Sequence, residues 1–323
     1  MLSSFAREGS PVYRIQWLER AFPEDGDAIE SYAAENLAMP IEHPLTEAYI
    51  ELIDAAAPVA TAHEIFLAIT IADAKSHRQI KQAGGGDAGA CELLMREMAS
   101  LESMLSSSGV VSNGLLSPRQ VARLIRSAYD PADVRRLASR AVGDPESAGT
   151  SSRNAWPMAT ENHWGYYQTD GAYHATFWIA EWPRLEASGD FLAPLLLQTD
   201  SARTVSVIME PISPGKALRE AETAHTSFLA DEELRARGGY NTSANRSRHY
   251  ESIVHREQEL ADGHGMFRFS GYVTVSANSH EELEERIGMV EQGAHQSRLD
   301  LRRLYGEQDA AFGFSLPLGR GLK

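Results

Sequence analysis

The stretch MFRFSGYVTVSANSHEELEERIGMVEQGAHQSRLDLRRL, residues 266–304, predicts a strand, a helix and a return strand in close succession. Apolar and polar residues alternate over 266–277, which is the pattern of a strand with one buried face. Ser279 and Glu282 then form a capping box, the sequence signature of a helix N-terminus. The helix behind this cap carries apolar residues at helical spacing, namely Leu283, Ile287, Val290 and Ala294. The return strand is expected over 299–304.

The segments before this unit predict a hairpin, a further strand and a helical arm. Asp170-Gly171 is a favoured two-residue turn, and strand-like segments flank it on both sides. Residues 204–210 alternate as a strand. Ser213-Pro214 opens a long charged helix, and a second helix follows from Ser243 to about Gly263. Together these two helices form an αα-hairpin arm over 214–264.

The first half of the chain shows a similar order of elements. A strand over 12–20 is followed by a helical stretch, and a buried strand is expected at 63–72. A helix runs up to Gly109, a short strand VVS follows at 110–112, and a helix capped by Ser117 extends to 129. The segment 143–157 is small, polar and rich in Pro and Gly, as expected of a long exposed loop.

This order predicts an α+β protein built from two split β-α-β (ferredoxin-like) subdomains, related by a pseudo-duplication. The expected division is an N-terminal subdomain over 1–130, a linker or long loop over 131–163, and a C-terminal subdomain over 164–323. The C-terminal subdomain contains the helical arm and ends in a tail at 307–323.

Composition restricts the class of protein. The net charge of -15 argues against general nucleic-acid binding, which needs a basic face. Cys91 is the single cysteine, so no internal disulfide can form, and a reducing cytosol with a thiol buried in a helix is expected. The opening residues lack the apolar core of a secretory signal. The apolar run FLAPLLL at 191–197 is far shorter than the roughly 20 residues of a membrane span.

Motifs for phosphate binding are incomplete. Gly215-Lys216 looks like the end of a P-loop, but position 210 is Glu and position 217 is Ala, where that loop needs Gly and Ser or Thr. A Ser-capped helix start is therefore the better interpretation. The glycine-rich GGGDAG at 84–89 does not complete a dinucleotide-binding pattern and is expected to be a flexible loop.

The histidines do not form a metal-binding pattern. His249 and His255 lie on a predicted helix at a spacing that separates their faces, so a solvent-facing polar stripe is expected. His174 alternates with aromatic residues on a strand and is expected to be a hydrogen-bonded sheet histidine. The aromatic residues of that region are expected to form the core of the sheet rather than a platform for bases: Trp164, Tyr166, Tyr167, Phe177, Trp178 and Trp182.

No nucleophile elbow appears either, so the sequence predicts no catalytic residue, no metal and no cofactor. A carboxylate pair assembled by the fold stays open.

The ordered motifs of the chain resemble a known family. They are EGSPVYRIQWLER at 8–20, DGAYHATFWIAEWPR at 170–184, RTVSVIMEP at 203–211, REQELADGHGMFRFSGYVTVSA at 256–277 and YGEQDAAFGFSLPLGRGL at 305–322. They are similar to the N-terminal, non-motor domain of the large conjugation ATPases of type IV secretion systems. The fuller resemblance is to actinobacterial conjugation-type proteins that carry this domain without the motor.

The resemblance implies a non-catalytic structural or adaptor component of a conjugative DNA-transfer apparatus. Its implied partners are the conjugation motor ATPase and a small inner-membrane secretion subunit, and its implied place is cytoplasmic, at the inner face of the plasma membrane. Members of the group usually begin with hydrophobic spans upstream of the matched part. The chain is therefore expected to be a fragment, a product of a mis-assigned start, or a variant whose span lies on another polypeptide.

The tail supplies the candidate contact residues. In the resembling family a Gln, an aromatic residue and a Leu-Pro pair precede the motor domain, and Gln308, Phe312 or Phe314, Leu316 and Pro317 match them. The full candidate set is Gln308, Phe312, Phe314, Leu316, Pro317, Leu318 and Arg320. The equally weighted alternative is that the tail packs on its own domain. Two other functions stay open, an α+β enzyme of unknown reaction and a mobile-element structural protein unrelated to secretion.

Overall fold

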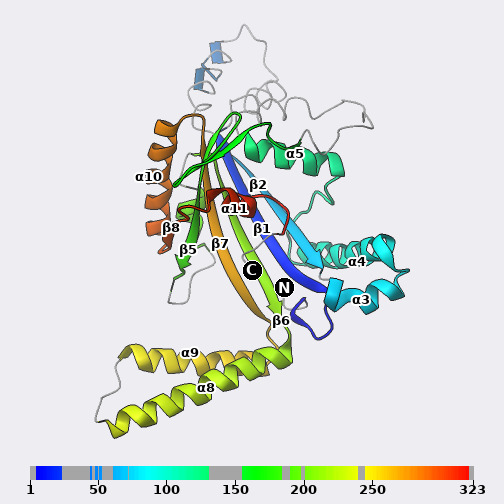
Figure 1. Cartoon of the computed structure of the whole chain (residues 1–323), viewed down its shortest axis with the longest axis vertical. Helices are drawn as coiled ribbons and strands as arrows, with labels where there is room; N and C mark the ends of the chain where they lie inside the picture. The colour runs from blue at the N-terminus through cyan, green and yellow to red at the C-terminus, as the bar shows by residue number, and fades with distance from the viewer. Residues whose placement is uncertain are drawn as a thin grey trace. The chain divides into compact units, whose positions relative to one another are not determined.

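A computed structural model describes residues 5–23, 44–45, 48–49, 51–52, 61–71, 73–130, 155–183, 190–197, 201–238 and 244–319 (Figure 1). The protein is of mixed α and β structure. The strands with described bounds are β1 (Val12–Pro23), β2 (Thr61–Ile71), β3 (Thr160–Asn162), β4 (Tyr167–Thr169), β5 (Tyr173–Glu181), β6 (Arg203–Ile212), β7 (Met266–Ala277) and β8 (Asp300–Arg303). The α-helices are α3 (Asp73–Gln82), α4 (Gly86–Ser107), α5 (Pro118–Tyr129), α7 (Ala193–Leu197), α8 (Pro214–Arg237), α9 (Ala244–Ala261), α10 (His280–Gln296) and α11 (Gln308–Phe312), and a 3-10 turn, η4 (Gly313–Ser315), follows the last of them.

The eight described strands form one sheet in the order β2-β1-β6-β7-β5-β4-β3, and β8 also pairs with β5. The pairing of β5 with β7, with β4 and with β8 is antiparallel. Since β7 occupies one edge of β5, strands β4 and β8 share the other edge. β4 reaches Tyr173 and His174 of β5, and β8 pairs from Phe177 onward.

The chain divides into two compact units, and the boundary passes through strands β1, β2, β6 and β7. The first unit comprises Met1–Ile15, Ile69–Gly114 and Met209–Phe269; the second comprises Gln16–Ala68, Leu115–Ile208 and Ser270–Lys323. The division at 131–163 expected from the sequence stays a prediction, since residues 131–154 of that segment lie outside the described residues.

In the first unit, helices α8 and α9 lie side by side as the predicted arm (Figure 1). Ring contacts and ion pairs hold the two helices together. Phe228 of α8 packs on Tyr250 of α9 with ring centroids 5.4 Å apart, and His225 Nδ1 lies 2.8 Å from Glu257 Oε2. Arg246 Nε donates to Glu232 Oε1 at 2.6 Å.

The second unit buries both faces of its sheet. On one face, alternate residues of β5 and β7 pack against α7 and α10, where Leu283, Ile287, Val290 and Ala294 are buried as predicted. On the other face, Tyr272 of β7 packs on Phe314 with ring centroids 4.2 Å apart. Helices α5 and α11 and the turn η4 cover this second face.

Several local signals in the sequence are confirmed. Ser117 caps α5 in a complete capping box with Gln120. Ser279 Oγ accepts from the Glu282 N–H at 3.2 Å and starts α10, but the Glu282 carboxylate accepts from the Asn278 N–H, so only half of the predicted capping box forms. Asp170 and Gly171 connect β4 to β5, as predicted.

Several expectations from the sequence are wrong. Residues 86–89 of the expected GGGDAG loop form the first turn of α4, and Trp164 is 74% exposed rather than part of the sheet core.

Val110 and Val111 form no strand, because the Val110 N–H donates to Leu105 O at 3.0 Å in a Schellman motif, with Gly109 in the left-handed conformation after the end of α4 at Ser107. The expected pseudo-duplication, which needs that strand, is not confirmed. Strand 63–72 forms as β2, but it ends the described strand order and Ile65 is 63% exposed.

A further wrong expectation concerns Cys91, which is exposed rather than buried. The buried stripe of α4 follows positions 89, 93, 97 and 101. Cys91 lies half a turn away from that stripe, because successive residues are about 100° apart around a helix.

Gly89 and Gly288 give a matched test of the helix packing. A Cβ added to Gly89 of α4 would lie 2.4 Å from the backbone O of Ile80 in α3, whereas a Cβ on Gly288 of α10 meets nothing within 4 Å. We expect Gly89→Ala to lower the free energy of unfolding by about 1–3 kcal/mol through overpacking. Gly288→Ala should raise it by about 0.4–1 kcal/mol. Urea unfolding measures both, and equal effects of the two substitutions would contradict the described contact between α3 and α4.

Candidate functional site

The candidate contact residues of the tail are mostly buried within the second unit. Gln308, Phe312, Phe314 and Leu316 are 0%, 2%, 6% and 1% exposed. Pro317 and Leu318 are half-buried, and Arg320 lies outside the described residues. The burial of these side chains agrees with the alternative in which the tail packs on its own domain. While the segment stays packed, its four most buried side chains are not part of a surface that a partner could meet.

Gln308 fills a gap in the edge of β5. Thr176 lies between the residues that pair with β4 and those that pair with β8, so neither strand satisfies its backbone N–H. The Thr176 N–H donates instead to Gln308 Oε1 at 2.7 Å, and Gln308 Nε2 donates to Thr176 O at 3.2 Å and to Leu304 O at 2.8 Å. A side-chain amide thus replaces one residue of a strand.

A second buried glutamine holds the segment that follows. Gln16 of β1 is 0% exposed, and its Nε2 donates to Phe314 O at 2.9 Å and to Leu316 O at 3.0 Å. The same Nε2 lies 2.9 Å from Ser206 Oγ, and Gln16 Oε1 accepts from the Gly319 N–H at 2.9 Å. Because η4 and the residues after it have no strand partner, this side chain satisfies backbone groups that would otherwise be buried without hydrogen bonds.

His174 lies under the same segment and is a structural histidine, as the sequence predicted. Its Nδ1 lies 2.8 Å from Ser276 Oγ and its Nε2 lies 3.1 Å from Thr169 Oγ1, while Phe312 packs on the ring at 4.6 Å between centroids. Burial lowers the pKa of His174 from 6.5 to about 3. The imidazole is therefore neutral near pH 7 and has both nitrogens engaged.

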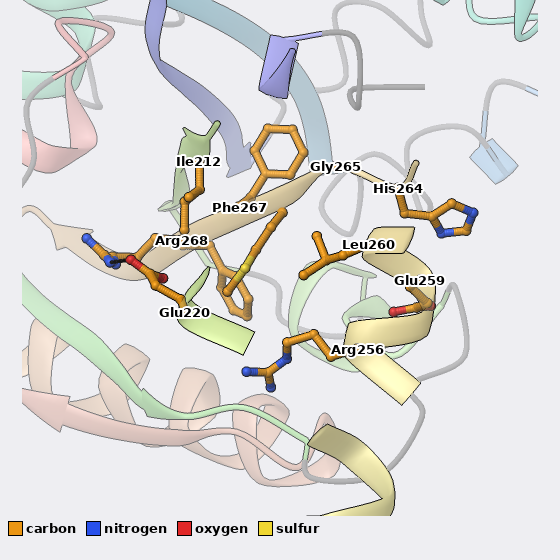
Figure 2. Close-up of a pocket in the computed structure, with 11 residues that line it drawn as sticks. Ile212, Glu220, Arg256, Glu259, Leu260, His264, Gly265, Phe267 and Arg268 are labelled. Carbon is orange, nitrogen blue, oxygen red and sulfur yellow. Dashed lines mark ion pairs between the residues drawn. The ribbon is translucent and has the colours of Figure 1, made fainter. Parts of the chain in front are cut away.

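A hollow of about 490 Å³ lies at the base of the arm in the first unit (Figure 2). Its apolar wall is formed by Ile212 of β6, Leu260 of α9 and Phe267 of β7. Charged and polar side chains surround this wall, namely Glu220, Arg256, Glu259, His264 and Arg268. Arg268 Nη2 lies 3.8 Å from Glu220 Oε1. An apolar slot with charges of both signs around it suits the side chain of a protein partner.

A second hollow of the first unit, of about 610 Å³, has more basic lining. Its cationic side chains are Arg7, Arg78, Lys216 and Arg268. One of its carboxylates, Glu210, is already paired with Arg14, whose Nη2 lies 2.6 Å from Glu210 Oε1. The incomplete P-loop of the sequence forms the start of α8 here: Ser213 precedes the helix without a capping hydrogen bond from its side chain, Pro214 is its first residue, and Lys216 lies in its first turn.

A buried ionic group in the second unit was not found from the sequence. Glu19 of β1 is 2% exposed, and its Oε1 lies 2.8 Å from His63 Nδ1 and 3.5 Å from Arg203 Nη2. Burial lowers the pKa of Arg203, and the charge of Glu19 opposes that shift. The available signal was the presence of Arg14, Glu19 and Arg20 within one strand whose other residues, apart from Gln16, are apolar or aromatic.

Among the described residues, no group of three or more His, Cys, Asp or Glu side chains could hold a metal ion. In the same part of the chain, no helix combines the length and the apolar character needed to cross a bilayer. No protein-family model matches the sequence, and no curated protein matches it either.

We call Gln16 and Gln308, the two buried glutamines that hold the tail on the sheet, the clamp. Substitution of Gln308 tests it. We expect Gln308→Ala to lower the free energy of unfolding by about 1–3 kcal/mol, since it leaves the buried Thr176 N–H without its acceptor, while Thr176 O keeps the Leu304 N–H as a donor. Gln292→Ala is the matched control, because Gln292 is exposed on α10 of the same unit. Its effect should stay within about 0.5 kcal/mol. Similar urea unfolding curves for the two variants would show that the amide of Gln308 is not needed.

His174 makes stability depend on pH in a defined direction. Its pKa of about 3 in the folded protein lies below the ordinary 6.5, so the unfolded chain binds the proton more readily. The stability from the neutral ring is complete above about pH 6.5 and is lost as the pH falls, at about 1.4 kcal/mol per pH unit. His174→Gln should make the free energy of unfolding fall less steeply between about pH 6 and 4. Urea unfolding at several pH values measures this, and equal slopes for both proteins would contradict it.

Proposed function

We propose that the protein is a non-catalytic structural or adaptor component of a conjugative type IV secretion apparatus, as the sequence resemblance implies. The observation that carries the proposal is the seating of the C-terminal segment. The residues that match the family pattern, Gln308, Phe312 or Phe314, and Leu316, hold that segment on the sheet through buried contacts. A pattern of this kind is expected wherever the same domain occurs, with or without a motor after it.

The order of strands supports the same proposal. In the second half of the chain, strands β5, β6, β7 and β8 follow in sequence and lie in the sheet in the order β8-β5-β7-β6. Helix α7 falls between the first two strands, the α8–α9 arm between the second and third, and α10 between the last two. We infer that this half is a split β-α-β, ferredoxin-like subdomain with a helical insertion.

The arm and the hollow at its base are the surface that we assign to the partner in this proposal. Leu260 and Phe267 form an apolar wall for a partner side chain, and the surrounding charged side chains can orient the bound partner. The partners are the conjugation motor ATPase and a small inner-membrane secretion subunit, and the place is the cytoplasmic face of the plasma membrane. In this account the motor ATPase supplies the energy of transfer.

Co-purification with a conjugation motor ATPase from the same organism tests the proposal. We expect the full chain to retain the ATPase, and Leu260→Asp to weaken that binding by about 10-fold, as expected for loss of a buried apolar anchor. Leu234→Asp is the control, since Leu234 is 67% exposed on α8 and does not line the hollow.

The two parts of the proposal fail separately. If the full chain does not bind the ATPase, the secretion role is wrong. If it binds and Leu260→Asp binds equally well, only the assignment to the base of the arm is wrong. Thermal unfolding of each variant checks that the substitution leaves the fold intact.

A further inference from the structure

Two aromatic side chains stand exposed next to each other in the second unit. Trp164, in the loop between β3 and β4, is 74% exposed, and Tyr305, just after β8, is 55% exposed. Their ring centroids are 6.2 Å apart and their planes differ by 23°. Trp side chains are highly buried on average in folded proteins and Tyr side chains are partly buried, so a stacked Trp–Tyr pair in solvent is an unusual surface feature.

The backbone around the pair fixes it in place. The Gly306 N–H donates to Trp164 O at 2.7 Å, and a Cβ on Gly306 would lie 3.0 Å from Trp164 Cζ3. Gly306 also has a φ of 81°, in the left-handed region that favours glycine. On the other side, Arg303 Nε donates to Gly165 O at 2.6 Å. The indole therefore rests with little freedom against a glycine backbone, while much of its surface stays open.

Two exposed carboxylates adjoin in sequence the aromatic platform, which consists of Trp164 and Tyr305. Glu161 has a side chain 72% exposed and lies 3.4 Å from His163, the neighbour of Trp164. Glu307 is exposed and follows Gly306 directly. The nearby cations already have carboxylate partners, since Arg303 pairs with Glu284 at 2.9 Å and Arg302 pairs with Asp300 at 3.2 Å. Arg303 Cζ already lies over the Tyr305 ring, 5.8 Å from its centroid. The platform thus offers the open face of Trp164 beside exposed carboxylates.

We propose that the aromatic platform binds a positively charged polypeptide segment of a partner protein, with an arginine side chain stacked on the open face of Trp164. Tryptophan is the strongest aromatic partner for a cation, and the planar guanidinium stacks on it better than an ammonium group does. The carboxylates of Glu161 and Glu307 attract the neighbouring basic residues of such a segment. A rigid Trp and Tyr that need no ordering on binding are the kind of anchor that dominates interfaces.

A single strand of nucleic acid is the other polymer that stacks on aromatic rings. The structure favours the basic polypeptide, because Glu161 and Glu307 would repel phosphates and the chain carries a net charge of -15. This inference is independent of the secretion role, since it concerns the chemistry of the bound segment and not the identity of the partner.

Fluorescence anisotropy with a labelled nona-arginine peptide and the full chain tests the platform at about 150 mM salt, where long-range attraction is screened. We expect Trp164→Ala to weaken binding about 3-fold or more. Trp156→Ala is the matched control, because Trp156 is 41% exposed and contacts Tyr129 in the same unit. Both substitutions leave the net charge unchanged, so non-specific attraction by the acidic chain affects them equally.

Three further binding measurements distinguish the proposed site from other modes of binding. Trp164→Phe should recover part of the affinity, a nona-lysine peptide should bind more weakly than nona-arginine, and labelled oligo-dT should show no binding that depends on Trp164. Equal affinities of Trp164→Ala and Trp156→Ala for the arginine peptide would overturn the proposal. Binding of oligo-dT that is lost in Trp164→Ala would replace it with a nucleic-acid site.

Discussion

The second unit depends on two buried glutamines that hold its C-terminal segment on the sheet. Backbone groups at a broken strand edge and in an irregular segment must find partners once they leave water. Gln308 supplies them at Thr176, and Gln16 supplies them at Phe314, Leu316 and Gly319. With these groups satisfied, Phe312 and Phe314 can cover the sheet as apolar core, and the neutral His174 can remain buried beneath them.

The clamp explains why residues that look like a docking tail do not form an exposed one. An apolar, Pro- and Gly-punctuated terminus has the composition both of a partner-binding segment and of a cover for its own sheet, and composition alone does not separate the two. The polar residues beneath the segment decide between them, and they come from β1, β5 and β6, far away in the sequence. The proposed function therefore assigns partner contact to the helical arm, at whose base apolar side chains line a hollow.

Signals that act over a few residues were readable from the sequence. The Ser279–Glu282 cap, the Asp170-Gly171 turn and the apolar stripe of α10 were all predicted, because each depends on neighbours in the chain. Val110 was misassigned because the Schellman motif after α4 uses its N–H, although its side chain suits a strand. Trp164 was grouped with core aromatics, yet it is exposed, because its burial depends on which loops meet at Gly306. The ionic group around Glu19 required the order of β2, β1 and β6 in the sheet.

Hydrogen exchange of single backbone amides tests the clamp most directly. The Thr176 and Gly319 N–H groups donate to side-chain oxygens of Gln308 and Gln16 rather than to a strand or helix. If the segment is an integral part of the fold, both amides should exchange as slowly as the core of β5 and β7, by global unfolding. Fast exchange at both positions, with a slowly exchanging core, would show that the segment detaches from the sheet and would contradict the account.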